Sequence, residues 1–122
     1  MAKIEVEGYN NFNTAVSENQ GKTVFALFTG SHDANGRSWC PDCVAADPVI
    51  EASLSKLPMD SVFIKCSVGD RAYWKNQQND FRIDPKLRLK SVPTLLKLGE
   101  PQRLEEEQCA KSDLVEMVFS ED

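Results

Sequence analysis

The sequence predicts an α/β domain in which a mixed β-sheet is covered by helices on both faces. Segments with strand patterns alternate with segments with helix patterns, an order typical of parallel strands joined by helices. One strand segment, residues 23–28, is almost uniformly apolar, as expected of a strand buried on both faces of such a sheet. The 122 residues suffice for one hydrophobic core, so we expect a single domain over residues 1–122.

The first half of the chain is expected to form two strands and two helices. A short strand is predicted before Gly8, because apolar residues there alternate with charged ones. Apolar residues at helical spacing then predict an amphipathic helix over 9–20. The buried strand follows, and a polar loop over 29–38 leads to a second helix over 44–57, which Pro48 should bend.

The second half adds three strands and two helices. A strand is predicted over 61–68, and the polar connection 69–90 that follows should contain one helix. A strand over 92–98 starts at a proline, and a short edge strand over 102–104 comes after the next turn. A final amphipathic helix carries the apolar residues of 114–119. The expected order is therefore βαβαβαββα.

Charge and hydropathy exclude several classes of partner. The formal net charge of −5 argues against nucleic-acid binding, which depends on lysine and arginine neutralising phosphates. The longest strongly apolar run, 24–28, is far shorter than the roughly 20 residues of a membrane-spanning helix. The first residues lack the apolar stretch of a signal peptide. We therefore expect a cytoplasmic protein without membrane or nucleic-acid partners.

Two cysteines three residues apart are the strongest chemical signal in the sequence. Cys40 and Cys43 lie where the polar loop enters a helix, so their side chains can meet within the first turn. The unpaired N–H groups at a helix N-terminus favour a thiolate, which would make Cys40 reactive. Pro41 suits an early helical position. Asp42 favours the helix terminus but repels a thiolate, and the sequence leaves the balance open.

The same spacing also occurs in zinc half-sites and in pairs of packed thiols. A zinc site needs two further ligands, and the chain offers only the isolated Cys66, Cys109 and His32. No metal is therefore expected. Cys66 and Cys109 are predicted to be buried, inert thiols. Lys65 and Arg37 are expected to be exposed surface charges.

Several segments resemble the thioredoxin family. The resemblance rests on a buried strand, on Trp39 followed by the C-x-x-C pair (WCPDC), on a helix with an internal proline, and on the segment 84–100. The longer loop before Trp39, the YWK of 73–75 and the NDFR of 79–82 are more narrowly similar to one branch of small thioredoxin-related proteins. The similarity covers nearly the whole chain and implies a thioredoxin fold.

The resemblance also implies a function. Members are cytosolic disulfide reductases that hold no bound cofactor and are recharged by thioredoxin reductase with electrons from NADPH. For this branch we expect a narrower range of protein substrates, activity on small disulfides such as cystine, and a dynein light chain as a partner. A monomer is expected.

The resemblance assigns roles to individual residues. Cys40 corresponds to the attacking nucleophile, Cys43 to the resolving thiol and Trp39 to the cover of the active site. Pro93 corresponds to a cis-proline that presents the backbone of the neighbouring substrate-binding residues, Val92 and Thr94. The alternative for Pro93 is an ordinary proline at the start of a strand. Pro41 and Asp42 complete the expected supporting residues.

Two departures from the family pattern raise new questions. Thioredoxins bury an aspartate below the resolving cysteine to take its proton, and Leu27 stands at the matching position. Our hypothesis is that Asp42 or water takes the proton of Cys43 instead. The loop 29–38 is longer than in ordinary thioredoxins, so we expect it to rim the active site and to exclude large protein disulfides.

Two other functions are compatible with the same residues. The cysteine pair could form a disulfide only to change the affinity for a partner, which would make the protein a redox-regulated binding module. A thiolate at Cys40 could also reduce hydrogen peroxide as a side activity. Turnover with a small disulfide distinguishes the reductase from the binding module.

Overall fold

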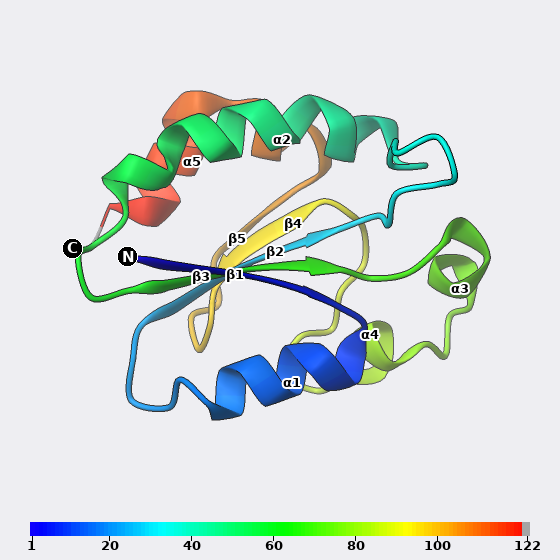
Figure 1. Ribbon diagram of the computed structural model, residues 1–122, viewed down its shortest axis with the longest axis horizontal. Helices are drawn as coiled ribbons and strands as arrows, with labels where there is room; N and C mark the ends of the chain where they lie inside the picture. The colour runs from blue at the N-terminus through cyan, green and yellow to red at the C-terminus, as the bar shows by residue number, and fades with distance from the viewer. Residues whose placement is uncertain (121–122) are drawn as a thin grey trace.

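The central element of the structure is a five-stranded β-sheet (Figure 1). This computed structural model describes residues 1–120. The strand order is β1-β3-β2-β4-β5. Neighbouring strands run parallel from β1 to β3 to β2, and antiparallel from β2 to β4 to β5, so the prediction of a mixed sheet is confirmed. The strands are β1 (Ala2–Glu7), β2 (Val24–Thr29), β3 (Val62–Ser67), β4 (Thr94–Lys97) and β5 (Arg103–Glu105).

Helices cover both faces of this sheet, as predicted. Figure 1 shows α2 and α5 on one face and α1 and α4 on the other, with α3 beyond the end of β3. No helix within residues 1–120 has both the length and the apolar character that crossing a bilayer requires. The helices are α1 (Tyr9–Ser17), α2 (Pro41–Ser53), α3 (Arg71–Lys75), α4 (Asp80–Ile83) and α5 (Ser112–Phe119), with short 3-10 turns η1 (Leu54–Lys56) and η2 (Glu106–Ala110).

Strand β2 lies in the middle of the core and is buried at every residue, as its apolar sequence predicts. Its side chains alternate between the two faces, so they divide between two apolar clusters. Ala26 and Phe28 pack on the side of α1, whereas Phe25 and Leu27 pack on the side of α2 and α5. The loop that follows β2 therefore starts from a rigid element.

The prediction of a single helix within 69–90 is wrong, because the chain forms two short helices there, α3 and α4. Each helix has its own N-terminal cap. The Asp70 side chain accepts a hydrogen bond from the backbone N–H of Tyr73 (2.9 Å), and the Asn79 side chain accepts one from Arg82 (3.1 Å). The Asn79 amide also donates to the backbone of Trp74 (3.0 Å). These capping bonds compete with a continuous helix and interrupt it.

Helix α2 begins three residues earlier than the predicted range 44–57. Pro41 occupies its first position, and Cys40 is the N-cap residue. The far end of the predicted range becomes the 3-10 turn η1. Pro48 lies inside the helix, and the bend expected there stays a prediction. The earlier start places both cysteines in the first turn.

Candidate active site

Cys40 and Cys43 lie side by side at the start of α2. Their Cα atoms are 5.2 Å apart, within the range that a disulfide spans, and their sulfur atoms are close to disulfide distance. Both residues are nearly buried, with 5% and 3% of their surfaces exposed. The predicted contact between the two cysteines is therefore present, and the pair can exist as a dithiol or as a disulfide.

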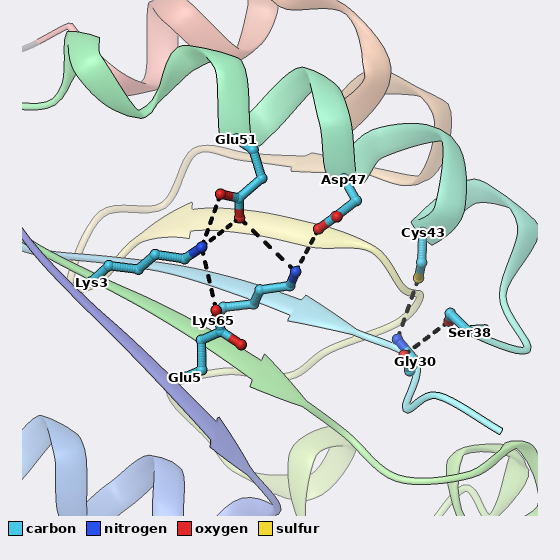
Figure 2. Close-up of polar contacts among 8 residues, drawn as sticks. All are labelled: Lys3, Glu5, Gly30, Ser38, Cys43, Asp47, Glu51 and Lys65. Atoms are coloured by element: carbon cyan, nitrogen blue, oxygen red, sulfur yellow. Dashed lines mark hydrogen bonds and ion pairs between the residues drawn. The ribbon is translucent and has the colours of Figure 1, made fainter. Parts of the chain in front are cut away.

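Backbone N–H groups point at both sulfur atoms. The N–H of Cys43 lies 3.2 Å from the Cys40 sulfur, at the positive end of α2. The N–H of Gly30 lies 3.4 Å from the Cys43 sulfur, a contact drawn in Figure 2. Such donors stabilise negative charge on sulfur. The surroundings thus favour a thiolate at Cys40, as the helix position predicts.

Trp39 covers the end of β2 next to the cysteines. Its indole N–H donates a hydrogen bond to the Gly69 carbonyl (2.9 Å). Its ring packs so closely on Gly30 that a Cβ atom there would lie 2.8 Å from the ring. Only glycine fits at position 30 without displacing the tryptophan. The sequence reasoning missed Gly30, although a glycine directly after a buried strand could have indicated it.

The segment around Pro93 passes next to Cys40. The Val92–Pro93 peptide bond is cis, the isomer that the resemblance implies. The Val92 carbonyl oxygen lies 3.5 Å from the Cys40 sulfur. Thr94 is fully buried, and its hydroxyl donates to the Ser91 carbonyl (2.7 Å). Val92 thus borders the site through its backbone, while the Thr94 side chain points into the fold. The substrate-binding role of both residues stays a prediction.

Asp42 and Pro41 occupy the first turn of α2. Pro41 is exposed and Asp42 is half-buried. The pKa of Cys109 is raised to about 12, by burial above all and, to a smaller extent, by the negative charges of Glu105 and Asp42. Asp42 is not among the residues that line the cavity next to Cys43.

A cavity of about 540 Å³ reaches Cys43. It is lined by Cys43 and by residues of α2, β1, β3 and the loop 29–38, but not by Cys40. His32 and Arg37 of the loop line the cavity and are exposed, as expected for Arg37. The loop therefore rims the site on the side of Cys43. Its action as a filter for large substrates stays a prediction.

Lys65 is not the exposed surface charge that we expected. Only 17% of its side chain is exposed, and its Nζ lies 2.5 Å from Asp47 Oδ1 and 4.0 Å from a Glu51 oxygen on α2. The expectation failed because α2, distant in sequence, presents two carboxylates over this part of β3. Alternation along a strand shows the face of a residue but not what covers that face.

Cys66 and Cys109 are fully buried free thiols, as predicted. Desolvation is the main cause that raises the pKa of each to about 12. Both thiols therefore stay protonated and unreactive near neutral pH. No group of three or more histidine, cysteine, aspartate or glutamate side chains within residues 1–120 is arranged to hold a metal ion.

We predict that iodoacetamide alkylates only Cys40 and Cys43 in the reduced, folded protein at neutral pH. The helix terminus favours a thiolate at Cys40, whereas complete burial raises the pKa of Cys66 and Cys109 to about 12 and keeps both protonated. Mass spectrometry should show at most two added groups before denaturation and four afterwards, since the chain has four cysteines. Rapid native labelling of Cys66 or Cys109 would contradict the assignment of these thiols as inert.

Comparisons with known proteins agree with this geometry. The family model described as "Thioredoxin domain-containing protein 17-like, thioredoxin domain" matches residues 5–121. Thioredoxin domain-containing protein 17 of Mus musculus is 55% identical over 120 residues, which cover 98% of this chain and 96% of that protein. The Homo sapiens protein of the same name is 52% identical with the same coverage.

The chain also resembles solved structures with little sequence similarity to it. A reduced thioredoxin pre-protein of Schistosoma mansoni matches with a TM-score of 0.59 and 17% sequence identity. The match covers 97% of this chain and 99% of that chain. The predicted thioredoxin fold is therefore confirmed.

Proposed function

The chain belongs to the thioredoxin domain-containing protein 17-like family, and we propose that it is a disulfide reductase working through Cys40 and Cys43. Family membership confirms the resemblance seen in the sequence, and the paired cysteines support a thiol–disulfide redox role. The observation that carries the proposal is the position of both cysteines in the first turn of α2, close to disulfide distance.

The proposed reaction has two steps. The Cys40 thiolate attacks one sulfur of a substrate disulfide, forms a mixed disulfide and releases the first substrate thiol. Cys43 then attacks the Cys40 sulfur, closes the Cys40–Cys43 disulfide and releases the second thiol. The substrate gains two electrons and the protein loses two. The backbone of Val92, next to Cys40, is available to align the incoming chain.

The reaction cycle needs a source of electrons and a set of substrates. We propose that thioredoxin reductase returns the Cys40–Cys43 disulfide to the dithiol with electrons from NADPH, in the cytoplasm and without a cofactor bound to this chain. Small disulfides such as cystine are the proposed substrates, and a dynein light chain is a proposed protein partner. The loop 29–38 would restrict larger protein substrates. We propose that the protein acts as a monomer.

Coupled consumption of NADPH tests this proposal. Purified protein is mixed with thioredoxin reductase, NADPH and cystine, and the decrease in NADPH absorbance is followed. We expect many turnovers per protein molecule, and a loss of at least about a thousandfold in the Cys40→Ser variant, because the nucleophile is absent. Consumption that stops after one equivalent would instead support the redox-regulated binding module.

A further inference from the structure

A cluster of charged side chains lies under α2, next to the resolving cysteine. Figure 2 shows Lys65 of β3 between the carboxylates of Asp47 and Glu51, which lie on successive turns of α2. Lys3 binds Glu51 (2.9 Å) and Glu5 (3.3 Å) at the far end of the cluster. Asp47 is therefore the member of the α2 pair that lies closer to the cysteines along the helix.

Asp47 and Cys43 share one face of α2 and one cavity. They are four residues apart in the helix, a spacing that puts their Cβ atoms about 5–6 Å from each other. Both line the cavity of about 540 Å³, whereas Cys40 does not. The Asp47 side chain is 47% exposed, so water can reach it, and Lys65 holds its carboxylate. A cavity of this size, with charged and hydroxyl side chains in its lining, has room for water between the carboxylate and the thiol.

The resolving step needs a group that takes a proton from Cys43. Leu27 stands where thioredoxins bury an aspartate, and it belongs to an apolar cluster. Asp42 is not among the residues that line the cavity shared by Cys43 and Asp47. The other acids that line the cavity, Glu5 and Glu7, lie on β1 and have their own partners, Lys3 (3.3 Å) and Ser31 (3.3 Å). Asp47 is the acid that shares a helix face with Cys43.

We propose that Asp47, oriented by Lys65, accepts the proton of the Cys43 thiol through cavity water during resolution of the mixed disulfide. The inference rests on the proposed function, because it concerns the second step of that reaction. As the proton moves to Asp47, a bond forms between the Cys43 and Cys40 sulfurs. The bond between Cys40 and the substrate sulfur breaks, and the substrate departs as a thiolate that takes a proton from solvent.

Dithiodipyridine allows the two steps to be observed separately. Attack by Cys40 releases one thiopyridone, and resolution by Cys43 releases the second, so stopped-flow absorbance shows two phases. We expect Asp47→Asn to leave the first phase unchanged and to slow the second about 10- to 100-fold near neutral pH, in the range of general-base effects. Glu51→Gln is the matched control, because it removes the other α2 carboxylate near Lys65 and should leave both phases unchanged.

The pH profile distinguishes proton transfer from a structural effect. The wild-type second phase should level off below the thiol pKa, whereas that of Asp47→Asn should continue to fall about tenfold per pH unit, because it needs preformed thiolate. The other charged groups facing the cavity are Glu5, Glu7, His32, Arg37 and Lys65. His32→Asn is measured alongside, because His32 is the histidine that lines the cavity. Asp47→Glu should restore much of the rate.

Three results would overturn the assignment. They are parallel pH profiles for the wild type and Asp47→Asn, equal slowing by Glu51→Gln, and a shift of the profile by Asp42→Asn alone. Two phases of equal amplitude in the wild type show dithiol chemistry whatever the variants do. If the second phase of Asp47→Asn has the wild-type rate, this inference is refuted and the proposed reductase stays intact. If the wild type itself lacks the second phase, both are refuted.

Discussion

Replacement of Cys43 by serine should stop multiple turnover and leave the substrate attached to Cys40. The Cys43 sulfur lies close to disulfide distance from Cys40. In the proposed reaction it acts as an intramolecular thiol, so its loss removes a large effective concentration. An external thiol must reach a Cys40 that is only 5% exposed. We expect NADPH consumption with cystine to fall at least about a thousandfold, in line with the loss of a covalent catalytic group.

The trapped species provides a direct measurement of this effect. Intact-mass analysis of Cys43→Ser after reaction with dithiodipyridine should show one thiopyridyl group, which reduction removes. The second thiopyridone phase should be absent while the first stays. Cys66→Ser serves as the control, because Cys66 is a fully buried thiol outside the cysteine pair. Continued turnover by Cys43→Ser would show that another group resolves the mixed disulfide.

The parts of the fold that could be predicted are those with a strong local pattern. The uniformly apolar run of β2 predicted a central strand, and the alternation in β1 and the spacing in α5 predicted their type. The split between α3 and α4 escaped prediction because it depends on capping by Asp70 and Asn79. Single side-chain hydrogen bonds of this kind decide helix ends but leave little trace in hydrophobic periodicity.

In the candidate site, too, the residues with a local sequence pattern were predictable and those that depend on distant contacts were not. Cys40 and Cys43 were evident from their spacing, because their contact is made within one helical turn. The roles of Lys65 and Asp47 depend on a contact between β3 and α2 across 18 positions in sequence, which local pattern cannot indicate. Gly30 depends on the position of the Trp39 ring, a packing detail that only the structure provides.

The environment of Leu27 leads to a second prediction with a large effect. Leu27 is 2% exposed, belongs to the apolar cluster under α2 and pairs in register with Lys65. Leu27→Asp should lower the free energy of unfolding by about 4 kcal/mol at neutral pH. Loss of a buried leucine costs about 2–5 kcal/mol by itself, and a carboxylate in apolar surroundings adds to it. Lys65 can offset part of this cost only by leaving Asp47.

Urea unfolding of Leu27→Asp and of the uncharged, similarly sized Leu27→Asn separates the cost of charge from the cost of shape. Burial raises the pKa of the introduced carboxyl above its unfolded value of about 3.9. The unfolded chain then releases its proton at lower pH than the folded protein, so Leu27→Asp loses stability as pH rises from about 4 through the folded pKa. The two variants should have similar stability near pH 4, and Leu27→Asp should be the less stable at pH 7.

Equal stabilities of the two variants at both pH values would mean that Lys65 fully compensates a carboxylate at position 27. In that case the sheet could hold an acid below Cys43, and the absence of one in this chain would need a cause other than stability.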